Sequence, residues 1–295
     1  MAEKADNAEK PESSGERGTT LAKLQASNAL IFLFAFAFIA YLLTRHILFA
    51  FLSGVSLISI FGLDILVGAT THGLKDELIE LVKAVAVALV IWYGIMFLLN
   101  TSSPISGIVS CSLLPAYERG DMIVLRGVPI NEINAPTVEL TADELAEVYR
   151  TVSPSCGTIG PITYNCVESC PRVAFPSGKP AASSAKCVRS LTINNVTYNE
   201  NLSSDVIVYA PSANGKYLSG DIIHRVFVKL KVGDKYFILT KGDNNDFMDA
   251  TVFDIVRQED VKGRVLARIP ILGYLKLFIS GYFSEPVGCD TALLH

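Results

Sequence analysis

The chain has 295 residues, 50% of them hydrophobic, and its 25 Lys and Arg against 29 Asp and Glu give a formal net charge of −4. This charge, without a basic stripe along the sequence, argues against nucleic acid as a partner, and we expect none. The apolar residues gather in the first third of the chain, which indicates a membrane anchor followed by one globular domain.

Residues 1–26 are charged and poor in apolar residues, which predicts a disordered cytoplasmic tail. Apolar stretches over 28–68 and 82–99 follow. A bilayer core about 30 Å thick needs roughly 20 helical residues to cross it, so the first stretch is long enough for two spans. We therefore predict a transmembrane anchor over 27–99 with three spans, at about 29–44, 47–66 and 80–99. An anchor of two spans is the alternative.

The orientation of the anchor follows from its basic residues. With three spans, the basic residues of the tail share a side with Lys75 and Lys83, and Arg45 lies on the opposite side. The positive-inside rule then places the tail in the cytoplasm and residues 100–295 outside a cell membrane that the chain crosses several times. The segment from Lys75 to Lys83 alternates charged and apolar residues at helical spacing and is predicted to extend the third span.

All six cysteines follow the last predicted span, where an oxidising compartment permits disulfides. Four of them lie in residues 129–200, a segment that we interpret as an insertion, and we expect these four to form disulfides of open pairing: Cys156, Cys166, Cys170 and Cys187. Zinc held by Cys166 and Cys170 is a disfavoured alternative because no His lies nearby. Three sequons on the same side are candidate glycosylation sites: Asn100, Asn195 and Asn201.

Residues 100–295 are predicted to form a mainly antiparallel β domain. Short runs rich in β-branched and aromatic residues indicate strands at Met122–Arg126, Val206–Tyr209, Ile222–Lys231 and Tyr236–Thr240. Val232–Lys235 is a predicted hairpin turn, and Thr141–Arg150 a predicted helix with a Thr cap and a Glu three residues later. Residues 266–283 are interpreted as a strand followed by an interfacial segment.

His224 is the one internal histidine of this domain, since His295 is the last residue of the chain. A lone histidine in a strand is more often structural than catalytic. A serine nucleophile, however, needs a base within hydrogen-bond reach, and here the base is either His224 or a lysine.

Five short sequence segments, taken in their order along the chain, favour a catalytic role for His224 over a structural one. They are Ser110–Pro115 with Gly120–Leu125, Ser204–Tyr209, Gly220–Val226, Thr240–Asn245 with Asp249, and Gly263–Gly273. Together they resemble the sequence boxes of the type I signal peptidase family, in the archaeal and endoplasmic-reticulum-like form that has His where bacterial members have Lys. The resemblance does not cover residues 1–70 or 129–200.

The resemblance implies N-terminal transmembrane helices and a mainly antiparallel β catalytic domain of signal-peptidase type. It implies that Ser112 is the nucleophile and His224 the general base. Asp243 and Asp249 are the candidate acidic partners, and the choice between them stays open. A hydroxyl two residues before the nucleophile contributes to the oxyanion hole in some members, which points to Ser110.

Two residues depart from the family box: Cys111 stands for a Gly and Leu113 for a Met. Cys111 raises the alternative of a cysteine nucleophile. Adjacent residues of an extended segment point to opposite faces, so Cys111 and Ser112 cannot both face one base. The register of the box favours Ser112.

The implied activity is that of a membrane-bound serine endopeptidase. It removes signal peptides from exported preproteins, cleaves after small residues at positions −1 and −3 through an acyl-enzyme, and requires no metal or organic cofactor. The expected partners are these signal peptides, the lipid bilayer and the protein-translocation channel. The alternatives are a catalytically silent binding or scaffold relative, and a self-cleaving regulatory peptidase, which would have Lys at position 224. Length, sequons and insertion favour an archaeal source.

Overall fold

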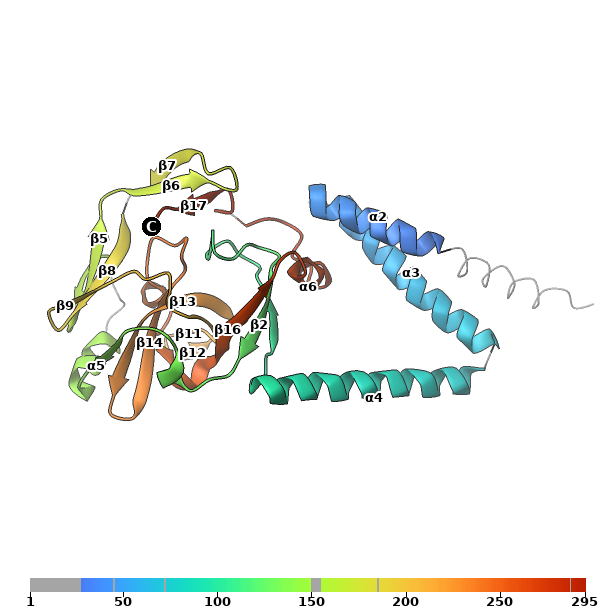
Figure 1. Cartoon of the computed structure of the whole chain (residues 1–295), viewed down its shortest axis with the longest axis horizontal. Coiled ribbons are helices and arrows are strands. Elements are labelled where there is room, and N and C mark those ends of the chain that lie inside the picture. Colours follow the sequence, from blue (N-terminus) through green and yellow to red (C-terminus); the bar gives the residue numbers. More distant parts are fainter. Residues whose placement is uncertain (1–27, 45, 72, 150–154, 185, 287) are drawn as a thin grey trace, which may run out of the picture. The chain divides into compact units, whose positions relative to one another are not determined.

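A computed structural model of the chain describes residues 28–44, 46–71, 73–149, 155–184, 186–286 and 288–295 (Figure 1). The tail predicted at 1–26 lies outside these residues. The chain divides into two compact units, Met1–Trp92 and Tyr93–His295. We describe each unit by itself.

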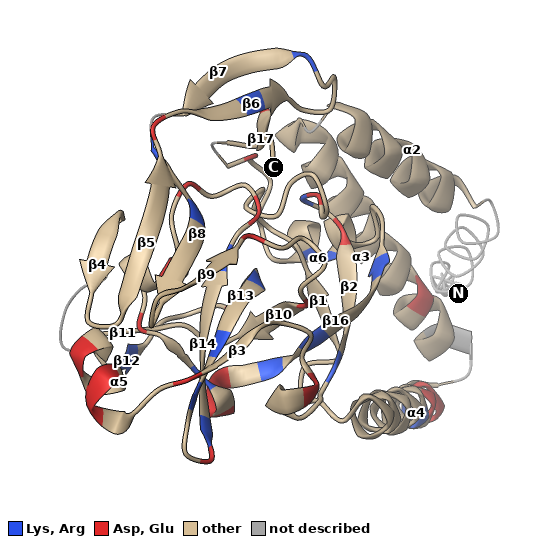
Figure 2. Ribbon diagram, turned by 60° about the vertical axis from the view of Figure 1, so that its left-hand side comes forward, with Lys and Arg blue, Asp and Glu red and all other residues tan. Residues whose placement is uncertain are grey.

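The first unit is helical, with α2 Ala29–Thr44, α3 Ile47–Thr71 and α4 Leu74–Leu99, whose end belongs to the second unit. Helices α2 and α3 pack against each other. The residues buried on α2 and α3 are mostly small, which allows close approach of apolar helices; they are Ala37, Tyr41, Ala50, Ser53 and Ser56. Neither α2 nor α3 carries a Lys or Arg, and Asp64 is their one acidic residue (Figure 2).

The three helices begin and end close to the predicted spans. The predicted helical extension is present, since α4 is a single helix of 26 residues that includes Lys75–Lys83. By length and composition, Ile47–Ala69 and Leu74–Leu99 can each cross a membrane, whereas α2 falls short at 16 residues. A third crossing by α2 therefore stays a prediction.

The second unit is built on an eight-stranded sheet. In spatial order its strands are β1 Ile105–Gly107, β2 Met122–Arg126, β16 Val261–Ile269, β10 Val206–Tyr209, β13 Ile222–Val232, β14 Lys235–Lys241 and β15 Val256–Arg257. The remaining strand, β3 Thr137–Glu139, pairs with β13 in parallel, and all other pairs are antiparallel. The prediction of a mainly antiparallel β domain is thus confirmed, and the four predicted strands are β2, β10, β13 and β14.

Local sequence signals placed the main turn and helix of this unit correctly. Gly233 and Asp234 connect β13 to β14, with Gly233 at φ 59° and Val232 opposite Lys235. The helix α5 runs over Ala142–Tyr149. Its cap is reciprocal, because the Glu144 N–H donates to Thr141 Oγ1 at 3.2 Å and the Thr141 N–H donates to Glu144 Oε2 at 2.7 Å.

The segment 129–200 contributes one smaller sheet and two of the three strands of another. One consists of β4 Gly157–Ile159, β5 Ile162–Val167, β8 Cys187–Ile193 and β9 Val196–Asn199, and the other of β17 Thr291–Leu293, β6 Cys170–Ala174 and β7 Pro180–Ser184. Ile162, Tyr164 and Leu191 share one core with Val228 and Leu239 of the main sheet. The segment is therefore part of the domain's core as well as a covering layer.

The remaining elements are short. β11 Ser212–Ala213 and β12 Lys216–Tyr217 form a two-stranded antiparallel sheet. Beyond the sheets lie the 3-10 turns η1 Ile130–Glu132, η2 Asp249–Thr251 and η3 Gln258–Asp260, and the helix α6 Gly273–Ile279. The predicted strand and following segment over 266–283 correspond to the end of β16 and to α6.

All six cysteines are paired, as Cys156–Cys166, Cys170–Cys187 and Cys111–Cys289. The four cysteines predicted to form disulfides thus bond among themselves. The zinc alternative for Cys166 and Cys170 is wrong, because a metal ligand must be a thiolate and both sulfurs are in disulfides. Cys111–Cys289 joins segments 178 residues apart and connects the predicted nucleophile's neighbour to the segment just before β17.

We expect Gly233→Ala to destabilise the β domain by about 1 kcal/mol, because a Cβ is disfavoured at positive φ. A cost of this size lowers the Tm of a 150–250-residue domain by about 2–4 °C. Thermal unfolding of the purified full chain measures the shift. Gly233→Asn is the matched control, since Asn tolerates this conformation, and equal shifts for both variants would contradict the argument.

Candidate functional site

Three residues far apart in the sequence form one hydrogen-bonded row. His224 Nε2 lies 2.8 Å from Ser112 Oγ, and His224 Nδ1 lies 2.6 Å from Asp249 Oδ2. Ser112 lies between β1 and β2, His224 is the third residue of β13, and Asp249 begins η2. Because a carboxylate only accepts, Nδ1 carries the hydrogen and Nε2 is free to accept from the Ser112 hydroxyl.

The register of the sheet explains how the Asp249 carboxylate is held. His224 lies opposite Ile207, and Val226 opposite Thr240, so Tyr209, His224 and Thr240 share one face of β10, β13 and β14. Asp249 Oδ2 accepts hydrogen bonds from Tyr209 Oη at 2.9 Å and from Thr240 Oγ1 at 2.6 Å. Burial, and next the charge of Asp249, raise the pKa of Tyr209 far above its usual range, so its hydroxyl stays protonated and keeps donating.

Tyr209 and Thr240 are site residues that the sequence reasoning missed. Both lie in blocks that resemble the family boxes, Tyr209 as the last residue of one and Thr240 as the first of another. A polar residue on the inward face of a buried strand would have pointed to both. The sequence alone does not say which face of a strand is inward, because that depends on the strand register.

Asp243 has a different partner from the one predicted. Its two carboxylate oxygens accept from Arg225 Nε at 2.8 Å and Arg225 NH2 at 2.7 Å. Arg225 follows His224 on β13 and therefore points to the opposite face of the sheet. Of the two candidate acids, Asp249 lies beside the imidazole, whereas Asp243 forms an ion pair with Arg225. That Asp249 orients His224 stays a prediction.

The segment carrying Ser112 is held by the loop that follows β14. The Asn244 N–H donates to the Ser112 carbonyl at 2.7 Å, and Asn244 Nδ2 donates to the Cys111 carbonyl at 3.1 Å. The sulfur of Cys111 is in its disulfide with Cys289, which excludes Cys111 as the nucleophile. Ser110 Oγ lies 3.2 Å from Ser112 Oγ, so its hydroxyl is next to the reacting atom.

Gly242 allows the loop after β14 to lie close to Ser112 and His224. A Cβ at this position would lie 2.8 Å from His224 Nε2 and 2.7 Å from the Ser112 carbonyl oxygen. Real side chains do not tolerate such contacts with a backbone oxygen and a packed ring, so the glycine is required by proximity.

A cavity of about 510 Å³ opens beside Ser112 and His224. Its apolar wall comes from the segment after β1 and from the start of β13, as Ile108, Val109, Leu113, Ile222 and Ile223. A nucleophile, a base with an orienting carboxylate and an adjoining apolar cavity together suit acyl transfer from a substrate with small apolar groups.

The three sequon asparagines Asn100, Asn195 and Asn201 are exposed. Their glycosylation stays a prediction.

The chain matches relatives over part of its length. Over 91 residues, 30% of this chain, it is 35% identical to the signal peptidase complex catalytic subunit SEC11 of Metarhizium robertsii, covering 51% of that protein. The subunits of the same name from Metarhizium acridum (34% over 91 residues, 30% of this chain and 51% of that protein) and Colletotrichum graminicola (35% over 82 residues, 26% of this chain and 45% of that protein) are similar. The chain thus spans about half the length of the curated relatives it matches. No protein-family model matches it.

We expect Gly242→Ala to lower kcat/KM for acyl transfer at the candidate site about a hundredfold, because a small displacement of the reacting groups has that effect. Steady-state kinetics of the purified full chain check it. Gly94→Ala is the matched control, since a Cβ there meets nothing within 4 Å. Unchanged kinetics of a folded Gly242→Ala variant would contradict the close approach.

Substitution of Asp249 and substitution of Asp243 should have different effects. Asp249→Asn should lower kcat about a thousandfold or more, since an amide neither fixes the Nδ1–H tautomer nor stabilises the imidazolium. Asp243→Asn should instead destabilise the domain by about 3 kcal/mol, because Arg225 is left buried without its carboxylate. Kinetics and thermal unfolding of both variants measure this, and the reverse pattern would restore Asp243 as the orienting acid.

Proposed function

Because the chain belongs to the type I signal peptidase family in its endoplasmic-reticulum-like form, we propose that it is a membrane-bound serine endopeptidase that removes signal peptides from exported proteins. The observation that carries this proposal is the row Ser112–His224–Asp249, with heavy-atom distances of 2.8 and 2.6 Å. Nothing in the site favours a silent scaffold, and the residue at position 224 is not the Lys of a Ser–Lys peptidase.

The mechanism uses each group of this row once in each half-reaction. Ser112 Oγ attacks the scissile carbonyl as His224 Nε2 takes its proton, and Asp249 stabilises the resulting imidazolium. The oxyanion accepts from the Ser112 backbone N–H and from the Ser110 hydroxyl. The imidazolium then protonates the leaving amine, the C–N bond breaks, and the acyl-enzyme remains. Water attacks the ester carbonyl with His224 as base, and the C–O bond to Ser112 breaks as the imidazolium returns a proton to Ser112 Oγ, which releases the acid product.

The substrate binds in extended form beside β1. This strand lies at the end of the main sheet, so one edge of its backbone is open to pairing with a peptide. The apolar cavity between residues 106–110 and 220–223 receives the small side chains at positions −1 and −3. Such a wall favours small apolar groups because it buries their surface without leaving a polar group unpaired.

The helical unit supports a membrane location, since α3 and α4 are long and apolar enough to cross a bilayer. We place the β domain outside a cell membrane, with three spans. The three disulfides suit an oxidising compartment. The helix α6 exposes Ile271, Leu272 and Ile279 at or beside its ends, at 60%, 46% and 72%, which suits contact with the membrane interface. Signal peptides, lipid and the translocation channel are the proposed partners.

The test is cleavage of a preprotein by the full chain in detergent micelles or nanodiscs. Ser112→Ala and His224→Ala should each abolish processing, because the nucleophile or its base is lost. Mature product is measured by electrophoresis, and the cleavage site by mass spectrometry.

The double variant Cys111→Ala/Cys289→Ala is the control for the cysteine alternative. It should keep measurable processing while Ser112→Ala keeps none. Full processing by Ser112→Ala would refute the assignment of Ser112.

A further inference from the structure

A second cavity, of about 650 Å³, lies against the nucleophile and shares Ser110 and Ser112 with the first. Its other walls come from residues 244–247, from Arg172 on β6 and from the last segment of the chain, including Asp290 and Thr291. Arg172 and Asp290 lie outside the blocks that resemble the family. The cavity therefore combines residues of these blocks with residues outside them.

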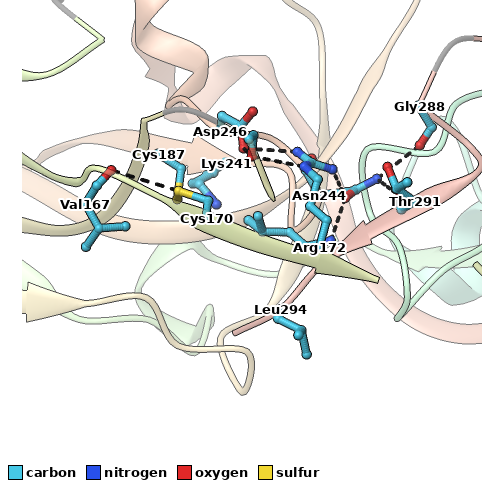
Figure 3. Close-up of polar contacts among 12 residues, drawn as sticks. Val167, Cys170, Arg172, Cys187, Lys241, Asn244, Asp246, Gly288, Thr291 and Leu294 are labelled. Carbon is cyan, nitrogen blue, oxygen red and sulfur yellow. Dashed lines mark hydrogen bonds and ion pairs between the residues drawn. A yellow bond between two sulfur atoms is a disulfide. The ribbon is translucent and has the colours of Figure 1, made fainter. Parts of the chain in front are cut away.

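The wall of this cavity is fixed by a saturated polar network (Figure 3). Arg172 donates to Asn244 Oδ1 at 2.8 Å, to the Asn244 carbonyl at 3.1 Å and to Asp246 Oδ1 at 3.0 Å. Asn244 Nδ2 in turn donates to the carbonyls of Thr291 at 2.9 Å and Gly288 at 3.3 Å. The same Asn244 holds the backbone of Cys111 and Ser112. The cavity is therefore formed before a ligand binds and is fixed relative to the nucleophile.

The charge of the cavity is unbalanced. Arg172 is neutralised by Asp246, whose Oδ1 also accepts from Ser184 Oγ at 2.8 Å. Asp290 is exposed, and within the described part of the chain its carboxylate makes no hydrogen bond or ion pair. One cation against two carboxylates leaves one negative charge, and Asp290 carries it.

Both cavities include Ser110 and Ser112, so a peptide bound across Ser112 reaches into both. The first cavity is lined by residues 106–110, which include and follow the end of β1, and the proposed pairing of the substrate with β1 assigns this cavity to the acyl side. The second cavity, which contains the charged Arg172, Asp246 and Asp290, is left for the residues that follow the scissile bond. Cleavage creates an α-ammonium on this leaving chain, which a nearby carboxylate stabilises.

We propose that the second cavity binds residues +1 and +2 of the substrate, and that Asp290 makes it favour basic over acidic residues there. This inference rests on the proposed function and names a specificity that the family resemblance does not supply.

The experiment uses three peptides with one common acyl side and with Lys, Gln or Glu at both +1 and +2. With the full chain, kcat/KM should fall in that order, about fivefold per step, the ratio that one partly exposed ion pair yields. Asp290→Asn should reduce the kcat/KM ratio between the Lys and Gln peptides and that between the Gln and Glu peptides. Asp290→Lys should reverse the order of the three peptides. The deacylation rate, measured from burst kinetics, should be equal for the three peptides because they leave the same acyl-enzyme.

Asp234→Asn is the matched control. It removes one exposed charge at the β13–β14 turn, about 26 Å along β13 from His224, and should keep the order of the wild-type chain. Equal cleavage of the three peptides, or an unchanged order in Asp290→Lys, would overturn this inference while leaving the peptidase intact. Cleavage of none of them by the wild-type chain, on an acyl side that matches a processed preprotein, would instead overturn the proposed function.

Discussion

The buried Asp249 carboxylate is the constraint on which the candidate site depends. Only 3% of this residue is exposed, and an unpaired charge there would be very costly. Three donors on three adjacent strands offset this cost: Tyr209 on β10, His224 on β13 and Thr240 on β14. A slip of one residue in either strand pairing would turn a donor to the other face of the sheet. The imidazole therefore has its orientation because the whole sheet has its register.

The nucleophile is positioned by a different set of contacts, which come from outside the sheet. Asn244 binds the backbone of Cys111 and Ser112, and Arg172 binds Asn244. The disulfide Cys111–Cys289 adds a covalent connection to the last segment. The base and the nucleophile are thus held by separate sets of contacts. The backbone of Gly242 lies close to both His224 and Ser112. This arrangement explains why a residue without a side chain stands at that position.

The segments outside the blocks that resemble the family lie around the row Ser112–His224–Asp249, whose three residues come from those blocks. The strands β6 and β17 pair with each other and bring Arg172 and the last segment to the nucleophile. Two cavities share Ser110 and Ser112, and the second is lined by Arg172, Asp246 and Asp290. Under the proposed placement of the substrate, selectivity on the leaving side can change without any change in the row Ser112–His224–Asp249.

The sequence by itself determined the helices of the anchor, the strands β2, β10, β13 and β14, the turn at Gly233 and the capped helix α5, because these follow from local apolar periodicity and turn chemistry. It also singled out Ser112 and His224, by the order of blocks and by the lack of another internal histidine in the domain. The tertiary structure alone decided between Asp243 and Asp249, revealed Tyr209 and Thr240, and paired Cys111 with Cys289. Each of these depends on which strands are neighbours and which face a side chain takes, and residues up to 178 positions apart must meet. Spacing along a chain carries no record of such contacts.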